Sequence, residues 1–429
     1  MASRNDGRNG RNGRNAAARK GASPEDMVRA RPLADSVLRL IWQERTISRA
    51  EIARRADLSR STVSEVVGAL LPTGLVSEGG PGESLGGRRP IMLHFEDEAC
   101  CILGVEMGAS HVAVALTDLR GRVQHWAHRN HPVRSDPEGT RKLLAELCEA
   151  TLATRRGAAK KLVGIGVAVP SPVDPLHPFE LSEVVLPVWK GRSGLEPLGE
   201  RFGVPVLVDN DANLGALAEY WWGAGRGVRD FAYVKVGTGV GSGHVIGGEL
   251  YRGSTGFAGE IGHLSIDPQG EPCICGLRGC LAMHVGSPAL VKRARTLLPE
   301  YPGSMLEGGE VSITAIEAAA LAADPLALRV TREAAEFLGI AVAGMLNLMN
   351  PSVVIVGGGI TGLGDRFLEP LRETVRLRTR VSSAAGATIV MSGLGPQSVP
   401  VGAASLVLKE ALANPGLFPT PTRAAKALR

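Results

Sequence analysis

Short amphipathic segments separated by turn residues fill the first quarter of the sequence. Apolar residues recur at helical spacing from Leu33, again after Ser48 and again up to Pro72, and this periodicity predicts three short helices. The second helix opens with a capping-box pattern, in which the Glu51 carboxylate is expected to bond back to the chain at Ser48. A tight turn at residues 57–59 separates the second and third helices, which is typical of a helix-turn-helix.

Two short strands are expected after the third helix, at residues 75–78 and 91–95, with a loop rich in glycine and arginine between them. This order predicts a winged helix-turn-helix, whose third helix would enter the major groove of DNA and whose loop would touch the backbone or the minor groove. A helical protein-interaction module with a solvated polar face is the alternative. The residues expected to contact DNA are Arg60, Ser61, Thr62 and Ser64 on the helix and Arg88 and Arg89 on the loop.

Beyond residue 100 the pattern changes to apolar strands, glycine turns and helices, which predicts an α/β fold. Strands expected at 101–107 and 111–117 flank one glycine turn, and strands expected at 231–236 and 243–246 flank another. The same device occurring twice, about 130 residues apart, indicates two related lobes. A cleft between the lobes is the natural position for a ligand.

The domain organisation follows from these patterns. The Arg, Asn and Gly repeat at the start of the chain offers nothing with which to form a core, so disorder is expected there. The expected divisions are a disordered basic arm at 1–31, the winged helix-turn-helix domain at 32–96, a first lobe at 97–228 completed by a helix at about 400–412, a second lobe at 229–399, and a flexible tail at 413–429.

The net charge of +5 is concentrated near the N-terminus. Residues 1–95 hold 16 Lys and Arg against 10 Asp and Glu, a balance that favours contact with a polyanion. Within this stretch, residues 1–31 alone hold 8 against 3. Most of the excess therefore lies in the arm, where nonspecific phosphate contacts and a solvated tail without function are both open interpretations. The prediction of DNA binding rests on the helix pattern more than on charge.

Composition excludes several classes of protein. Apolar residues make up 44% and charged residues 21% of the chain, as in soluble globular domains and unlike disordered or collagen-like chains. The longest apolar stretch, 338–356, is interrupted by polar residues and a proline, and the N-terminus has no apolar signal segment, so neither membrane spanning nor secretion is predicted. Six cysteines are too few for a disulfide framework in 429 residues, and a reducing cytoplasm is expected.

Three of the six cysteines lie within eight positions, with a histidine ten residues before the first of them. Histidine nitrogen and cysteine sulfur are the usual ligands of tetrahedral zinc, and four protein ligands would leave no open position for catalysis. We therefore expect one structural zinc ion per chain, with three unrelated reduced thiols as the alternative. The expected ligands are His263, Cys273, Cys275 and Cys280.

Two further motifs could carry chemistry in the cleft. The run at 237–243, GTGVGSG, allows several backbone amides to approach a phosphate, although such hairpins also occur for steric reasons. The apolar strand at 206–208 ends in DNDAN, where a carboxylate can accept the proton of a substrate hydroxyl or, as the alternative, simply cap a helix. Glu260 and His263 are spaced to share one face toward a polyhydroxylated ligand, and a metal on one ring nitrogen of His263 would fix the orientation of the other.

Taken together, these motifs resemble the ROK family of bacterial repressors, open reading frames and sugar kinases, and specifically its repressor branch with an N-terminal winged helix. The resemblance extends from Leu33 to about Leu412, and its ordered motifs include GIGVAVPSPVD, VDNDAN, GTGVGSG, GEIGH, CICGLRGCL and NPSVVIVGGG. It implies two lobes of the actin-like ATPase (ribonuclease H-like) fold with a sugar in the cleft. It also implies sugar contacts at Asn210, Asp211, Glu260 and His263, with Asp211 as the base in kinase members, and phosphate loops at Glu106, Gly108, Gly237, Thr238, Gly239 and Gly241.

The sequence departs from the kinase pattern at three positions. Glu106 stands where kinase members usually carry Asp, Ala282 where they carry a sugar-binding Glu, and Ser171 where a glycine is common. These departures argue against ATP and Mg²⁺ as cofactors. We predict a homodimeric or homotetrameric repressor that binds a palindromic double-stranded operator and senses a sugar or sugar derivative, with no membrane partner. An ATP-dependent kinase of hexoses or N-acetyl amino sugars, with an attached DNA-binding domain, is the alternative.

Overall fold

The computed structural model describes residues 33–81, 89–380 and 386–419. The predicted basic arm, Arg88 at the predicted wing tip and the last ten residues lie outside these ranges. The described residues form two compact units, one ending at Phe95 and the other running from Glu96 to Pro419.

The described residues of the N-terminal unit form three α-helices and a small antiparallel sheet. The helices are α2 (Ala34–Glu44), α3 (Arg49–Arg55) and α4 (Arg60–Leu70), and the sheet has the order β1 (Thr46–Ser48), β3 (Ile91–Phe95), β2 (Val76–Pro81). The short strand β1 was not expected from the sequence. It adds a third strand to the predicted pair and joins α2 to the sheet through the backbone.

Serine side chains begin both α3 and α4. Ser48 Oγ accepts a hydrogen bond from the Glu51 amide at 3.2 Å, which is one half of the expected capping box. The other half is wrong, because the Glu51 carboxylate accepts hydrogen bonds from Arg54 and Arg55 instead. Two guanidinium groups within one turn offer a carboxylate stronger, charge-assisted bonds than a backbone amide does.

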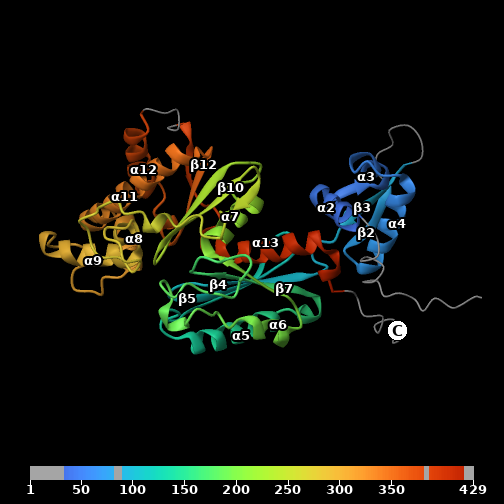
Figure 1. Cartoon of the computed structure of the whole chain (residues 1–429), viewed down its shortest axis with the longest axis horizontal. Coiled ribbons are helices and arrows are strands. Elements are labelled where there is room, and N and C mark those ends of the chain that lie inside the picture. The colour runs from blue at the N-terminus through green and yellow to red at the C-terminus, as the bar shows by residue number, and fades with distance from the viewer. Residues whose placement is uncertain (1–32, 82–88, 381–385, 420–429) are drawn as a thin grey trace, which may run out of the picture. The chain divides into compact units, whose positions relative to one another are not determined.

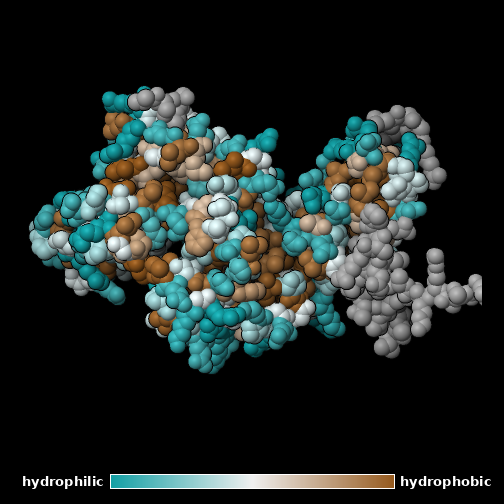
Figure 2. All heavy atoms as spheres, in the orientation of Figure 1, coloured by the Kyte–Doolittle hydropathy of each residue, from teal (hydrophilic) through white to brown (hydrophobic). Residues whose placement is uncertain are grey.

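The described residues of the second unit form two five-stranded sheets. The first has the order β6 (Val123–Asn130), β5 (His111–Thr117), β4 (Cys101–Met107), β7 (Leu162–Val169), β8 (Val206–Asn210). Its strands β4 and β7 are buried throughout, as expected of nearly continuous apolar sequences, and Glu106 is the one charged residue in them. Helices α5 (Pro137–Ala153) and α6 (Glu196–Phe202) cover one face of this sheet (Figure 1), and their outer surface is hydrophilic (Figure 2).

The second sheet has the order β11 (Glu249–Tyr251), β10 (Val240–Ile246), β9 (Phe231–Val236), β12 (Val353–Gly358), β13 (Thr388–Met391). Its outer face is covered by helices that share one large apolar core with it. The predicted strand at 243–246 begins earlier, at Val240, so the glycine turn is limited to residues 237–239. The covering helices are α8 (Ala282–Val285), α9 (Ser287–Leu297), α10 (Ile313–Leu321), α11 (Pro325–Met349) and α12 (Asp365–Arg378).

Two helices pack between the sheets. Helix α13 (Ser398–Ala413) lies on β4 and β7 of the first sheet, and α7 (Asp211–Trp222) lies on β9 and β10 of the second, with α7 and α13 packed together (Figure 1). Glycines permit this close packing, because a Cβ at Gly104 would lie 1.8 Å from the Pro400 carbonyl oxygen. The two-lobed α/β fold expected from the sequence is confirmed.

The C-terminal end of the described chain differs from expectation. A flexible tail was predicted from residue 413, but a turn of 3-10 helix follows α13 at Pro415–Leu417, and Phe418 is buried. An aromatic side chain removed from water anchors these residues to the unit. Among the described helices, none combines the length and the hydropathy that crossing a bilayer would require.

Candidate functional site

Asn210 and Asp211 lie at the junction of β8 and α7, where the sequence placed a candidate site. Asn210 is the N-cap of α7, and its Oδ1 accepts hydrogen bonds from the amides of Ala212 and Asn213 at 2.9 and 3.2 Å. Its Nδ2 donates to the Ser171 carbonyl at 3.0 Å. The helix-cap interpretation therefore applies to the Asn210 side-chain oxygen, while Nδ2 uses one of its two hydrogens on Ser171. Asp211 begins the helix, and its carboxylate is directed elsewhere.

Asp211 is joined to Glu106 by a lysine that the sequence analysis did not single out. Lys235, on β9 of the second lobe, donates from Nζ to Asp211 Oδ2 at 2.7 Å and to Glu106 Oε1 at 2.8 Å. The side chains are 15%, 15% and 6% exposed for Lys235, Asp211 and Glu106. The sequence FAYVKV (Phe231–Val236) did contain a signal for this ion pair, because a single lysine within a buried strand requires partners of opposite charge.

Electrostatics at Glu106 reflect this arrangement. Burial by itself would raise the pKa of the Glu106 carboxyl, but the nearby Lys235 charge and a contact with His111 outweigh it and hold the pKa at about 2. His111 Nε2 lies 3.5 Å from Glu106 Oε2. The predicted phosphate-loop carboxylate is thus paired with the Lys235 ammonium and lies beside the His111 ring.

A second ion pair links the lobes beside the first. Arg252, which follows β11 in the second lobe, donates from Nε and Nη2 to Asp209 Oδ2 at 3.0 and 2.5 Å. Asp209 is almost fully buried at the end of β8 and also accepts from the Asn213 side chain at 3.1 Å. Neither member of this pair was predicted, and DNDAN gave no indication of which of its carboxylates faces an arginine.

Glu260 and His263 face each other as expected from their spacing. His263 Nε2 lies 3.9 Å from Glu260 Oε2. Burial, and then the charge of Asp211, raises the pKa of Glu260 to about 7, so Asp211 lies near enough to act on it. The structure therefore brings three of the four predicted sugar contacts, Asp211, Glu260 and His263, into one region.

The four predicted metal ligands lie together. One ligand atom from each of them falls within 4.8 Å of all the others. His263 Nδ1 lies 3.5 Å from Cys273 Sγ, and Cys275 Sγ lies 3.5 Å from Cys280 Sγ. Tetrahedral zinc, with bonds of about 2.0–2.3 Å, holds its ligand atoms about 3.5–3.8 Å apart, so the residues fit such an ion. With Nδ1 on this side, Nε2 of His263 remains on the side of Glu260.

The glycines of the 237–243 run serve two purposes. A Cβ at Gly243 would lie 2.4 Å from the Ala212 carbonyl oxygen, so this glycine lets α7 pack closely. Gly237 and Gly239 have open space where a Cβ would stand. The turn is held at Gly237, whose carbonyl accepts from the amide and hydroxyl of Ser287 at 2.9 and 3.0 Å. The part of the motif that can face a ligand is therefore the turn, with Thr238 at its centre.

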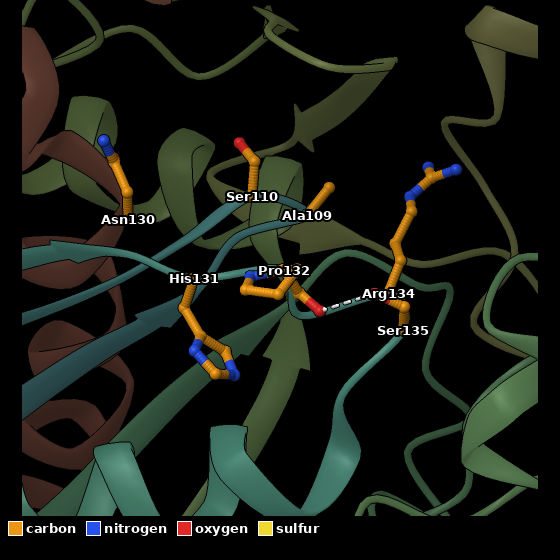
Figure 3. A pocket seen from close by; sticks show the side chains of 7 residues that line it. All are labelled: Ala109, Ser110, Asn130, His131, Pro132, Arg134 and Ser135. Carbon is orange, nitrogen blue, oxygen red and sulfur yellow. Dashed lines mark hydrogen bonds between the residues drawn. The ribbon is translucent and has the colours of Figure 1, made fainter.

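The other glycine turn borders a hollow of about 490 Å³ on the first lobe (Figure 3). Arg134 and His131 extend in different directions from this segment (Figure 3). After burial, the charge of Arg134 is the next cause that lowers the pKa of His263, which places this cation near the predicted sugar contacts. Arg134 was missed by the sequence analysis because it lies in no motif. The lining residues are Ala109, Ser110, Asn130, His131, Pro132, Arg134 and Ser135.

The predicted DNA contacts lie at the start of α4. Arg60, Ser61 and Ser64 are exposed and Thr62 is partly exposed. Ser59 Oγ, 2.7 Å from Ser61 Oγ, accepts from the Thr62 amide at 3.0 Å and so caps the helix. Arg89 is exposed before β3. The arrangement presents polar groups at a helix N-terminus, where phosphate and base edges are commonly bound.

The family model described as "ROK family" matches residues 102–410, which is more than half of the chain. The chain belongs to the ROK family. It is 32% identical over 386 residues to the xylose repressor of Caldicellulosiruptor bescii, covering 88% of this chain and 96% of that protein. It is 31% identical over 384 residues to the DNA-binding transcriptional dual regulator NagC of Escherichia coli K12, covering 88% and 92%.

Two solved ROK structures differ in how much of the chain they match. A ROK family transcriptional regulator, described as a homolog of the E. coli MLC protein, has a TM-score of 0.74 and 28% identity and covers 90% of this chain and 96% of its own. A ROK family glucokinase from Streptomyces griseus, in complex with glucose and AMPPNP, has a TM-score of 0.62 and 30% identity but covers 71% of this chain and 98% of its own. The resemblance to the ROK family inferred from the sequence motifs is confirmed.

Proposed function

We propose that this ROK protein is a sugar-responsive transcriptional repressor. The observation that carries the proposal is the extent of the matches to named repressors. A match over 88% of the chain is longer than the unit Glu96–Pro419, so it reaches into the N-terminal unit. The glucokinase match, by contrast, covers 71% of the chain. The N-terminal unit is therefore what this chain shares with regulators, and DNA binding is the activity that we assign to it.

The N-terminal unit, about residues 32–96, is proposed to be a winged helix-turn-helix. In this proposal α4 enters the major groove with Arg60, Ser61, Thr62 and Ser64, and Arg88 and Arg89 of the wing contact the backbone or the minor groove. Two copies in a homodimer or homotetramer would read the half-sites of a palindromic operator. The arm at 1–31 would add nonspecific phosphate contacts.

The cleft between the lobes at about 97–228 and 229–399 is proposed to bind the effector sugar. Asp211, Glu260 and His263 offer acceptors and a ring nitrogen for sugar hydroxyls, and Asn210 orients the helix that carries Asp211. A sugar that prefers one arrangement of the lobes would shift the equilibrium between the DNA-binding and released states by that preference alone.

We propose that His263, Cys273, Cys275 and Cys280 hold one structural zinc ion per chain. Such an ion would fix the chain around residues 273–280 and orient His263 toward the sugar. Metal analysis of the purified wild type is expected to give about one zinc per chain, and Cys275→Ser is expected to remove it and lower the yield of folded protein. A wild type without zinc would contradict the assignment.

The alternative is an ATP-dependent sugar kinase with an attached DNA-binding domain. The glucokinase match and the open face of the turn at Gly237–Gly239 favour it. The ion pair from Lys235 to Asp211 argues against it, because a carboxylate already paired with an ammonium group is a weak acceptor for a substrate proton. A coupled assay with ATP, Mg²⁺ and a panel of hexoses and N-acetyl amino sugars distinguishes the two. Turnover that Asp211→Asn abolishes would establish the kinase.

Effector binding is tested first by thermal unfolding of the protein with single sugars and sugar phosphates, beginning with xylose, N-acetylglucosamine and glucose. A ligand at 100 times its Kd raises the unfolding free energy by about 2.7 kcal/mol. Glu260→Ala is expected to remove the stabilisation by the same ligand. Stabilisation that persists in Glu260→Ala would place the effector elsewhere.

A further inference from the structure

Three carboxylates, those of Asp209, Asp211 and Glu106, gather where the two lobes meet, and two cations of the second lobe face them. The pairing is unequal. Arg252 binds Asp209 alone, whereas the single ammonium of Lys235 lies between Glu106 and Asp211. Lys235 therefore has the position of a cation shared by two oxygen ligands from different parts of the first lobe.

The geometry of this position resembles that of a metal ion. Carboxylate oxygens at the ends of β4 and β8 converge on one point, and the atom at that point is positively charged and almost removed from water. Divalent cations that prefer oxygen ligands bind at such places through one or two carboxylates. Here the chain supplies the charge itself, at 2.8 and 2.7 Å from the two oxygens.

We propose that Lys235 is a built-in cation of the cleft, which takes the place of a divalent metal between Glu106 and Asp211 and neutralises Asp211. In this role it is a positioning residue. Asp211 keeps its other oxygen for a ligand hydroxyl but, paired with the ammonium, binds that hydroxyl without removing its proton. The proposal deepens the proposed function and rests on it, since it explains how a kinase-like cleft can hold a sugar and not phosphorylate it.

The direction of the charge effects supports this geometry. Burial works against the charged form of Lys235, yet the charges of Asp211 and Glu106 raise its pKa above the ordinary lysine value, so the group stays protonated at neutral pH. The bridge also crosses the lobes, because Glu106 and Asp211 belong to the first lobe and Lys235 to β9 of the second. Removing the ammonium leaves two buried carboxylates without a counterion.

The test uses full-length, zinc-loaded protein, with Mn²⁺ alone as the probe. Electron paramagnetic resonance measures how much Mn²⁺ remains free in solution. Lys235→Met is expected to bind Mn²⁺ at least about tenfold more tightly than the wild type, with about one ion per chain. The double variant K235M/E106Q should lose that binding, because one of the two ligands is gone. The matched control is Lys409→Met, whose lysine also lies 2.8 Å from a glutamate but on the surface, and it should behave as the wild type.

Two results would overturn the proposal: equal Mn²⁺ affinity in the wild type and in Lys235→Met, or a folded Lys235→Met that binds no Mn²⁺. A measurement on the wild type guards against a variant that fails to fold. In pulsed acetylation read by mass spectrometry, Lys235 should react at least about tenfold more slowly than Lys409, and Asp211→Asn should accelerate it. A Lys235 that reacts as fast as Lys409 contradicts the proposal. Neither experiment uses sugar or DNA, so failure of the proposed function would be seen separately.

Discussion

Two charged networks in this protein have similar geometry and different surroundings. On α3 of the N-terminal unit, Arg55 lies 2.6 Å from both Glu51 and Glu44, with side chains 31–42% exposed. In the cleft, Lys235 lies 2.7 and 2.8 Å from its two carboxylates, with side chains 6–15% exposed. Bond length does not distinguish the two networks, whereas exposure to water does.

The pKa values of the two networks, like their bond lengths, do not distinguish them. Hydrogen bonds from Arg54 and Arg55 lower the pKa of Glu51 to about 2, and Lys235 and His111 hold the pKa of Glu106 at about 2 against the opposing effect of burial. Water solvates the members of the first network when it is broken, and salt screens it. In the second network, a charge that loses its partner stays buried. The energetic consequences of disruption should therefore differ greatly.

The largest effect is expected for Lys235→Met. Breaking one side of a buried ion pair destabilises proteins by about 3–5 kcal/mol, because the remaining charge is left uncompensated. Urea unfolding should show this loss relative to the wild type, and the double variant K235M/E106Q should recover part of it. A loss below about 1 kcal/mol would mean that water reaches these carboxylates and that the two networks are alike.

The second largest effect is expected when acid protonates the network of Lys235, Glu106 and Asp211. Since the pKa of Glu106 is about 2 in the folded protein and 4.5 in the ordinary state, the stability it contributes is fully present above about pH 5 and is lost as the pH falls toward 2. Unfolding free energies measured from pH 6 to pH 3 should therefore decline less steeply in Glu106→Gln than in the wild type. Parallel curves would assign the acid sensitivity to other carboxylates.

Substitutions in the N-terminal unit should change DNA affinity rather than folding stability. The double variant R60A/R89A removes two exposed cations. We expect it to weaken the free energy of DNA binding by about 1–3 kcal/mol, the usual cost of losing one base-contacting arginine. The unfolding midpoint should be nearly unchanged. Fluorescence anisotropy at fixed salt measures this loss, and ligand-induced thermal shifts check that the cleft is unaffected. An equal loss of both activities would contradict separate roles for the two units.

The smallest effect is expected for Glu51→Gln. It breaks the contacts to Arg54 and Arg55 but leaves the Ser48 cap and the apolar face of α3 in place. The midpoint of urea unfolding should change little, and any change should shrink further in high salt. A loss as large as that of Lys235→Met would remove the distinction between the networks.

The sequence predicted the bounds of several strands, because their apolar runs end at turn residues with strong local preferences. Ile91–Phe95, Cys101–Met107 and Phe231–Val236 have the bounds that were expected. The predicted metal ligands also lie together, because short spacing along the chain limits where Cys273, Cys275 and Cys280 can go.

Features that depend on the meeting of distant segments were missed. The partners of Lys235 come from β4 and from the start of α7, and no residue near Phe231–Val236 indicates them. The partner of Arg252 lies 43 positions away along the chain. The Glu51 carboxylate was misassigned for a related reason, since a motif states which bond is possible and not which of several donors wins.

The central claim is that a sugar in the cleft changes the affinity of this protein for DNA. The most direct measurement selects a preferred duplex from random sequences and then follows its binding by anisotropy at fixed salt, with and without each sugar of the panel. We predict that at least one sugar changes the Kd about tenfold or more in the wild type and leaves it unchanged in Glu260→Ala. Failure to prefer any duplex over random DNA, or a Kd that no sugar alters, would contradict the account.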